Sequence, residues 1–391
     1  QVQAVARAIS DHLTPRTTAY HEIWLDRKKV AGAVDEEPIY GRTYLPRKFK
    51  IGVAVPPWND VDVFSQDLGF IAITEQERLL GFNVVVGGGM GTTHGDPETY
   101  PRVGDVIGFC APDQVLAVAE HVVTVQRDFG DRSNRKHARL KYTIADRGVA
   151  WFRDQVESRA GLMLGAARGY RFVSNTDRFG WSDGTDGRGH LTLWIPSGRV
   201  ANTGERPLLA GLHAIAEVLK DNGGGFRLTP NQNVIVAGVS DDARPLVEAL
   251  ARRHGLMPDQ AGSELRLRSL ACVALPTCGL AMAESERYMP DFLSRLEALL
   301  GRHDLEDSPL HVRMTGCPNG CARPFLAEIG LVGKAPGRYN LYLGGDRAGE
   351  RLNRLVRENV DEEEILAVLE PLLARFSRER IEDEAFGDFL E

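Results

Sequence analysis

Four cysteines fall in two short stretches of this chain of 391 residues. Cys272 and Cys278 lie in LACVALPTCGL, and Cys317 and Cys321 lie in MTGCPNGC. A proline stands between the cysteines of each pair, and the second pair also encloses a glycine. Each stretch is therefore expected to turn sharply and to present two thiolates from one loop. Cys110 stands apart in IGFCAPDQ and is expected to be a buried structural residue.

Two loops that each present two thiolates suit an inorganic centre, and four cysteines are what a cubane [4Fe–4S] cluster requires. Zinc also accepts four thiolates, but its usual pairs are separated by two to four residues. The five residues between Cys272 and Cys278 fit that spacing poorly. A redox-active pair would have the form Cys-x-x-Cys beside a βα unit, which this sequence lacks. Spacing thus favours an iron–sulfur cluster over zinc, and four buried, unligated cysteines are the remaining alternative.

Two further stretches carry positive charge. In YLPRKFKIGV, Lys48 and Lys50 share one face if the segment is extended, because side chains alternate with period two. A solvated strand end is the alternative for this pair. SNRKHARLKYTIADRG is expected to be a basic helix, and such a charge run is usually a solvated helix face. The basic residues of interest in it are Arg135, Lys136, Arg139 and Lys141.

Composition excludes several classes of protein. A net charge of −7 argues against general nucleic-acid binding, which normally leaves a basic surplus. No apolar run reaches the roughly 18 residues of a membrane span. A large chain with few, clustered cysteines and no export signal favours a reducing compartment, here the cytoplasm. The chain opens without Met inside a helical pattern, QVQAVARAISDHL, so it is interpreted as a piece of a longer protein.

An internal repeat is visible in the order of short motifs. Residues 51–88 contain IGVAVPPWND, GFIAI and FNVVVGG, and residues 311–345 contain HVRMTGCPNG, EIGLVG and YNLYLGG. Shared order at similar spacing predicts two copies of one structural unit, with chance resemblance of β-rich sequence as the alternative. The cysteines fall in the second copy, so one copy would keep the shape and the other the chemistry. Between the copies, residues 188–254 are expected to form an α+β unit in which HLTLWIPSGRV is a hairpin.

The cysteine spacing and TGCPNGC resemble the sulfite and nitrite reductase family, which couples a [4Fe–4S] cluster to siroheme. YLPRKFK, GFNVVVGGG, RLTPNQN, CGLAMAE and LVGKAPGRYNLYLGG are similar too, so the resemblance covers nearly the whole chain. It implies an α/β fold in which two related lobes flank a ferredoxin-like α+β unit, and a part of the first siroheme-binding half that is missing here. The implied domains are an N-terminal helix and linker (1–45), a first siroheme-binding lobe (46–175), a ferredoxin-like unit (176–255) and a cluster- and siroheme-binding lobe (256–391).

The resemblance also implies roles for individual residues. Cys272, Cys278, Cys317 and Cys321 would ligate the cluster, and Cys321 would also be the axial ligand of the siroheme iron. Lys48 and Lys50 would bind sulfite and deliver protons. Arg139 would pair with siroheme carboxylates. Further candidates in the cofactor pocket are Arg135, Lys136, Lys141, Arg227, Asn231, Gln232 and Asn319; ordinary strand-end or turn hydrogen bonding is the alternative for the last four.

The activity that the resemblance implies is the six-electron reduction of sulfite to sulfide in sulfur assimilation. GKAPGRYN is more similar to the NADPH-linked members, so the implied electron donor is a flavoprotein reductase subunit that takes electrons from NADPH; ferredoxin is the alternative donor. One alternative function is siroheme nitrite reductase, which uses the same metals on another oxyanion. Another is an iron–sulfur electron-transfer protein without siroheme.

Overall fold

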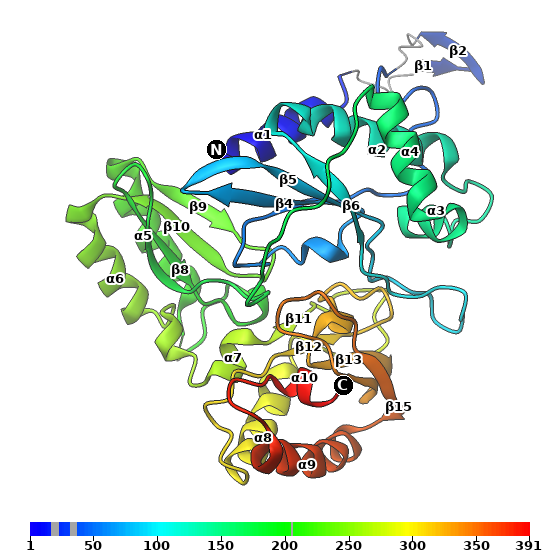
Figure 1. Ribbon diagram of the computed structural model, residues 1–391. Coiled ribbons are helices and arrows are strands. Elements are labelled where there is room, and N and C mark those ends of the chain that lie inside the picture. Colours follow the sequence, from blue (N-terminus) through cyan, green and yellow to red (C-terminus); the bar gives the residue numbers. More distant parts are fainter. Residues whose placement is uncertain (17–22, 32–36, 205) are drawn as a thin grey trace. The chain divides into compact units, whose positions relative to one another are not determined.

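The computed structural model describes residues 1–16, 23–31, 37–204 and 206–391 (Figure 1). Parts of the expected N-terminal linker, residues 17–22 and 32–36, lie outside the described residues. The chain divides into two units, each with its own core, and they are described here one at a time. Unit 1 comprises residues 1–57, 62–89 and 101–171, and unit 2 comprises residues 58–61, 90–100 and 172–391.

Unit 1 is built on a four-stranded sheet in the order β3-β4-β5-β6. β3 runs parallel to β4, and the other neighbours are antiparallel. Runs of valine, isoleucine and phenylalanine favour these strands, since such side chains pack well on a pleated, half-buried surface. The strands are β3 (Ile51–Ala54), β4 (Leu68–Glu75), β5 (Arg78–Val86) and β6 (Asp105–Cys110), with a separate pair, β1 (Ile23–Leu25) and β2 (Lys28–Ala31).

Helices of unit 1 cover one face of this sheet. Phe70 of β4 and Phe82 of β5 meet edge to face there, with ring centroids 5.9 Å apart, and they share a core with apolar residues of the helices. The N-terminal helix contributes Ile9 and Leu13 to that core. The helices are α1 (Val2–Leu13), α2 (Val115–Phe129), α3 (Leu140–Arg147) and α4 (Val149–Ala160).

The C-terminal part of unit 2 has a five-stranded sheet in the order β11-β12-β13-β14-β15. Helices α8 and α9 pack together beside it, and their apolar faces complete its core (Figure 1). The strands are β11 (Leu270–Ala271), β12 (Val312–Thr315), β13 (Ile329–Ala335), β14 (Arg338–Leu343) and β15 (Arg354–Val360). The helices are α7 (Glu264–Arg268), α8 (Met289–Gly301), α9 (Glu362–Glu379) and α10 (Phe386–Phe389).

The predicted repeat is confirmed by topology and register. In each copy a strand is followed by a one-turn 3-10 helix, a parallel strand and an antiparallel strand; the 3-10 helices are η1 (Val63–Ser65) and η6 (Pro324–Leu326). The glycines at the end of the antiparallel strand make the same contact in both. Gly88 donates its N–H to the Gln66 carbonyl at 2.9 Å, and Gly345 donates to the Ala327 carbonyl at 3.2 Å.

The predicted ferredoxin-like unit forms a second sheet of unit 2, in the order β7-β8-β10-β9, with a core of its own. Helix α5 ends at Gly223, which adopts the left-handed conformation (φ +71°) that caps a helix. The strands are β7 (Gly180–Asp183), β8 (Gly189–Leu193), β9 (Gly225–Leu228) and β10 (Val234–Val239), and the helices are α5 (Leu208–Asn222) and α6 (Arg244–Arg253).

Two local predictions are wrong. HLTLWIPSGRV is not a hairpin, because β8 pairs with β7 and β10. The turn at 196–198 leads toward α5 instead. The side-chain oxygen of Asn202 accepts from the Ala210 N–H at 3.0 Å and holds the first turn of α5.

The basic helix begins only at Leu140. Asp131 and Asn134 accept hydrogen bonds from backbone N–H groups two residues ahead, and such turns compete with a helix.

No helix in the described parts of the chain is both long and apolar enough to cross a membrane.

Candidate functional site

The two cysteine loops start from neighbouring strands of one sheet. β11 and β12 are parallel, so their carboxyl ends meet at the same edge. Cys272 follows β11 and donates its N–H to the Met314 carbonyl at 3.1 Å, which continues the ladder. Gly316 follows β12 and donates its N–H to the Cys272 sulfur at 3.3 Å. The pairing of two short strands therefore brings the two loops side by side.

Gly316 is the point at which the two loops pack most closely. Its carbonyl accepts from the N–H groups of Met282 and Ala283, at 2.7 and 3.1 Å, which holds the return segment of the first loop. A Cβ at position 316 would lie 2.6 Å from the Ala274 Cβ and 2.6 Å from the Ala283 carbonyl oxygen. A side chain there would push the loops apart, so glycine is required.

The CPNGC loop is turned by Gly320, which has a φ of +64°. The Pro318 carbonyl accepts from the Thr92 N–H and hydroxyl at 2.9 and 3.2 Å. The Asn319 backbone N–H donates toward the Cys317 sulfur and opposes the rise of its pKa. These contacts involve the backbone of the loop, so both roles considered for the Asn319 side chain stay predictions.

The four cysteine side chains differ in exposure. Cys317 is buried, Cys272 and Cys278 are half-buried, and Cys321 is exposed. Burial raises the pKa of the Cys317 thiol, and the charges of the other three cysteines raise it further. Burial also raises the pKa of Cys272, with a contribution from Cys321. Thiols that affect one another's ionisation in this way lie in one neighbourhood.

Among the residues that the structure describes, no three His, Cys, Asp or Glu side chains converge on one point as a single metal ion requires. A tetrahedral zinc site would hold its sulfurs about 2.3 Å from one ion. A cubane takes each thiolate on a different iron, so its ligands stand farther apart. The four cysteines provide, from one neighbourhood, the four thiolates that such a cluster takes.

Unit 1 contains a second group of interest, the basic cluster, made of Arg102, Arg139 and Lys141 around Gly87–Gly89. Arg102 donates to the Gly87 carbonyl at 2.9 Å and pairs with a neighbouring carboxylate. Lys141 donates from Nζ to the Gly89 carbonyl at 3.2 Å. Arg139 donates two hydrogen bonds to buried Asp67, from Nε at 3.0 Å and from Nη2 at 2.8 Å.

Lys141 shows that the basic cluster carries an excess of positive charge. Lys141 is only 1% exposed to solvent. Burial lowers the pKa of Lys141 to about 7, and the Arg139 and Arg102 guanidinium groups lower it further, while Asp67 opposes them. An anion placed beside these cations would restore the charged form of the lysine. The basic cluster therefore fits a carboxylate-rich group such as siroheme.

Lys48 and Lys50 are both exposed in the extended segment that leads into β3, and Phe49 between them packs toward the core. This is the alternation that the sequence predicted. Arg135 and Lys136 lie exposed in the turns of residues 131–139 and are not members of the basic cluster.

The remaining candidates lie in the ferredoxin-like unit. Arg227 is exposed on β9. Asn231 accepts from Arg323 Nη2 at 2.8 Å, and Arg323 lies two residues after Cys321, so Asn231 is tied to the CPNGC loop. The buried side-chain oxygen of Gln232 has no hydrogen-bond partner among the described residues. Gln232 lines a cavity of about 420 Å³ together with residues that include Val273, the neighbour of Cys272.

Sequence reasoning did not single out Asp67, Arg102 or Arg323. For Asp67 a signal existed: it stands directly before β4, where Glu328 stands before β13 of the second copy, and both are fully buried. An acid kept at the same place in both copies could have been noticed by aligning them. Arg102 and Arg323 carry no comparable pattern, because the Gly87 carbonyl and the Asn231 amide to which they donate belong to other segments of the chain.

Two lobes of one topology, a four-cysteine site in one and a buried basic cluster in the other, define a class of iron–sulfur redox protein with an anion-binding lobe. Comparison with known proteins gives the family. Residues 4–164 match the model of the nitrite and sulphite reductase 4Fe-4S domain, and residues 183–253 match that of the nitrite/sulfite reductase ferredoxin-like half domain.

Individual relatives agree with these matches. The chain is 61% identical to the sulfite reductase [NADPH] hemoprotein beta-component of Myxococcus xanthus, over 98% of this chain and 67% of that protein. It is 56% identical to the protein of the same description from Oceanobacillus iheyensis, over 100% of this chain and 67% of the relative. Among solved structures it is similar to the Mycobacterium tuberculosis NirA protein, with a TM-score of 0.73 and 27% identity over 88% of this chain and 63% of that chain.

The chain thus spans about two thirds of the length of these relatives. It belongs to the nitrite and sulfite reductase family, whose cofactors are a [4Fe–4S] cluster and siroheme.

Proposed function

We propose that this chain carries the cluster site and a large part of the siroheme site of a sulfite reductase hemoprotein, which reduces sulfite to sulfide. The observation that carries the proposal is the pair of cysteine loops at adjoining strand ends, in a chain that is 61% identical to a sulfite reductase hemoprotein over nearly its whole length. Siroheme nitrite reductase and a siroheme-free electron-transfer protein are less well supported, because the curated relatives described above are sulfite reductases.

Cys272, Cys278, Cys317 and Cys321 hold the cluster. Cys321 would also bind the siroheme iron, and its exposure supports this second role, since a fully enclosed thiolate could not reach another group. When bound, the two groups supply electrons and an iron site on which sulfite is reduced. Gly320 and Gly316 allow the loops to place the four sulfurs.

Lys48 and Lys50 bind sulfite and donate protons. Sulfite is a small dianion, so two ammonium groups on one face of an extended segment offset its charge. Release of each sulfite oxygen as water consumes protons, and lysines that contact the oxygens are placed to supply them. Phe49 holds the segment to the core, so both lysines project from the same side.

Arg139 and Lys141 pair with siroheme carboxylates, because they form a buried cluster with excess positive charge. Asn231, Gln232 and Asn319 are further candidates for siroheme contacts in unit 2; the support is the hydrogen bond of Asn231 to Arg323, near the CPNGC loop, and the unpartnered Gln232 oxygen. Arg135, Lys136 and Arg227 are exposed, and they are proposed as weaker candidates for the siroheme carboxylates.

The electron donor is a flavoprotein reductase that takes electrons from NADPH, as the descriptions of the relatives suggest. The proposed location is the cytoplasm, because few, clustered cysteines favour a reducing compartment.

The decisive experiment is anaerobic reconstitution with iron, sulfide and siroheme, followed by absorption spectroscopy, iron counting and turnover with sulfite and with nitrite. Four irons per chain, siroheme bands and faster turnover of sulfite than of nitrite are expected in the holoprotein.

Cys321→Ser is expected to remove siroheme coupling and sulfite reduction together, because a hydroxyl ligand is harder and less covalent than a thiolate. Cluster bands without siroheme bands would support the electron-transfer protein instead, and preference for nitrite would support the nitrite reductase.

A further inference from the structure

Asp67 is a fully buried acid at the centre of the basic cluster. Its carboxylate accepts the backbone N–H of Lys50 at 2.9 Å and two hydrogen bonds from the Arg139 guanidinium, at 2.8 and 3.0 Å. A buried carboxylate is tolerated when it is paired and fully hydrogen-bonded in this way. One side chain therefore fixes both the start of β3 and a guanidinium that is 72 residues away in the sequence.

The backbone of Asp67 makes a third connection. Its carbonyl accepts from the Gly87 N–H at 2.9 Å. Gly87 begins the glycine run 87–89, and the carbonyl of Gly89 in that run accepts a hydrogen bond from Lys141 Nζ. The lysine segment, the glycine run and Arg139 thus meet at Asp67.

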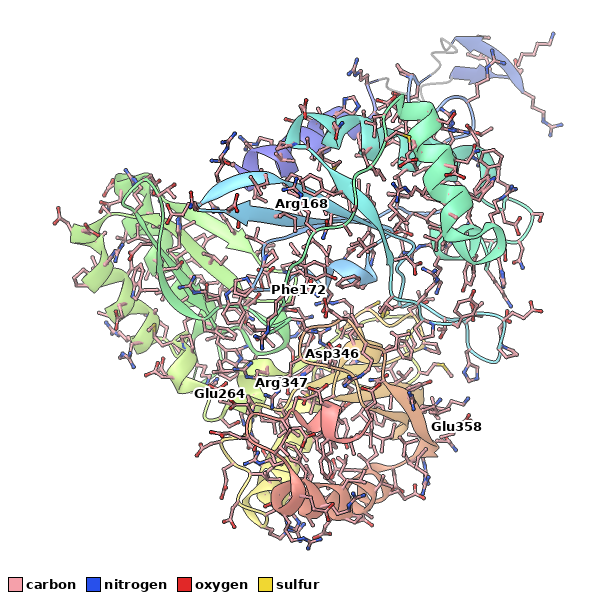
Figure 2. All side chains as sticks on the ribbon, in the orientation of Figure 1. Arg168, Phe172, Glu264, Asp346, Arg347 and Glu358 are labelled. Carbon is pink, nitrogen blue, oxygen red and sulfur yellow. The ribbon has the colours of Figure 1, made fainter. Side chains whose placement is uncertain are left out.

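The second copy of the repeat separates the structural part of this arrangement from the part that is special to unit 1. Glu328 accepts the backbone N–H of His311 at 3.1 Å, as Asp67 accepts that of Lys50, and its carbonyl accepts from Gly344 at 3.1 Å. The other carboxylate oxygen of Glu328 accepts from the Gly387 N–H at 3.0 Å. Nε of Arg347, which is labelled in Figure 2, lies 3.7 Å from that oxygen, beyond hydrogen-bond distance.

The strand contact is therefore common to both copies, whereas the two-point contact with an arginine belongs to the first. In that copy the same carboxylate also adjoins the lysines and the basic cluster. In the second copy the Glu328 carboxylate instead meets the ring Nδ1 of His311 at 3.2 Å.

We propose that Asp67 is a positioning residue that holds the Lys48–Lys50 segment and the Arg139 guanidinium in fixed relation, so that sulfite-binding and cofactor-binding cations share one anchor. The proposal rests on the function proposed above, from which it takes the roles of those cations. Asp67 is buried and acts through its partners rather than by touching sulfite.

Asp67→Asn tests the proposal, because the amide keeps the shape but offers one acceptor oxygen and adds an NH₂ group that faces the donors. Hydrogen exchange is measured by mass spectrometry on the full chain without cofactors. Amides of residues 50–54 are expected to exchange at least about tenfold faster than in the wild type, the effect of losing one buried charge-assisted hydrogen bond. Unchanged exchange there overturns the proposal.

Glu328→Gln is the matched control, since it makes the same neutralising change at the same point of the other copy. It is expected to speed exchange in residues 311–315 and to leave residues 50–54 at the wild-type rate. If Asp67→Asn does not fold, Arg139→Gln gives the second measurement, because it removes one partner and leaves Asp67. Faster exchange in residues 50–54 of that variant supports the proposal, and an unchanged rate overturns it.

Two readouts separate positioning from simple loss of stability. The charge of Asp67 raises the pKa of Lys141, so in Asp67→Asn the lysine titrates at lower pH, as followed by NMR of labelled lysine, whereas Glu328→Gln leaves its titration unchanged. In the holoprotein, kcat/KM for sulfite falls by about a hundredfold, the typical cost of misplacing binding groups by about 1 Å.

Failure of this proposal is distinguishable from failure of the proposed function. If Asp67→Asn leaves kcat/KM unchanged while Lys50→Met lowers it, Asp67 is not a positioning residue and the lysine roles stand. If Lys50→Met also leaves kcat/KM unchanged, the lysine pair does not bind sulfite, and the positioning role of Asp67 is excluded as well.

Discussion

Single side chains decide the charge of the basic cluster. Lys141 is enclosed by the core of unit 1 and by two guanidinium groups, so its ammonium form is disfavoured until an anion arrives. A lysine in such a place is a sensitive reporter, because its pKa responds to both stability and ligand binding.

The stability of the cofactor-free chain is expected to depend on pH through Lys141. The pKa of Lys141 is about 7 in the folded chain and about 10.4 when it is unfolded, so between these values the unfolded chain binds more protons. The free energy of unfolding therefore rises with pH across this window, by up to about 1.4 kcal/mol per pH unit from this group. Chemical denaturation at pH 6, 7.5 and 9 measures it.

Lys141→Met removes this contribution. The variant should exceed the wild type in stability most strongly below pH 7, and the difference should shrink toward pH 10. A difference that stays constant with pH would contradict the assignment of a depressed pKa to Lys141. Added siroheme should flatten the dependence in the wild type, because its carboxylates stabilise the charged amine.

Changing Lys48 or Lys50 to Met should leave the absorption of the cofactors nearly intact and lower sulfite turnover by roughly 10²–10⁴-fold, the usual contribution of a positioned acid–base group. Methionine keeps the length of the side chain and removes both charge and proton. Lys220→Met is the control, since the Lys220 ammonium pairs with Glu217 on α5. Loss of siroheme from both variants, with no separate kinetic effect, would instead assign these lysines to cofactor retention.

Elements, rather than individual residues, place the four cysteines. Because β11 and β12 are parallel and adjacent, each loop leaves the same edge of the sheet, and a spacing of 38 residues between the loops does not separate them in space. The close packing of the loops then depends on small residues where they meet, Gly316 and Ala274.

Gly316→Ala is expected to reduce cluster incorporation. The new Cβ would lie 2.6 Å from both Ala274 and the Ala283 carbonyl oxygen, so the loops must separate, at a cost of about 1–3 kcal/mol. Iron per chain after reconstitution and the midpoint of chemical denaturation measure the effect. Gly279→Ala, next to Cys278 but with open space at its Cβ, should keep the parent iron content. Equal iron content in the two variants would show that the loops tolerate separation.

At the scale of the whole molecule, one topology is used twice for different purposes. Both copies keep the parallel strand pair, the 3-10 turn and the buried acid, whereas the ligands differ: cysteines follow β12, and lysines precede β3. In Figure 1 the strands of the first copy are drawn in blue and those of the second mainly in orange. A shared frame with divergent loops explains why one fold can hold a metal cluster and an anion site.

Cluster assembly without siroheme should stabilise one unit and not the other. Because all four cysteines belong to unit 2, hydrogen exchange should slow in β11–β14 and stay unchanged in β3–β5 when iron and sulfide are added. The chain with Cys272→Ser serves as the control, and iron and sulfide should not slow hydrogen exchange in either of its two sheets. Slowing of equal size in both sheets would contradict the separation into two units.

Much of the fold and of the metal site follows from local sequence. The four cysteines, the repeat and the strands of both copies were predicted because strand alternation, turn residues and short loop spacings are properties of a few consecutive residues. The start of the basic helix at Ser133 and the hairpin at Ser197 were mispredicted because side-chain turns and the start of α5 compete locally with the expected elements.

The sequence by itself determined the cysteine set and the two copies of one strand pattern, since both are carried by spacing along the chain. Only the tertiary structure decided that Asp67 meets Arg139 and the Lys50 backbone, that Lys141 is enclosed among cations, and that Asn231 is bonded to Arg323, two residues after the CPNGC loop. No spacing rule relates residues 67 and 139. Their contact, and the burial that sets the ionisation of the groups around it, exist only once distant segments have packed together and excluded water.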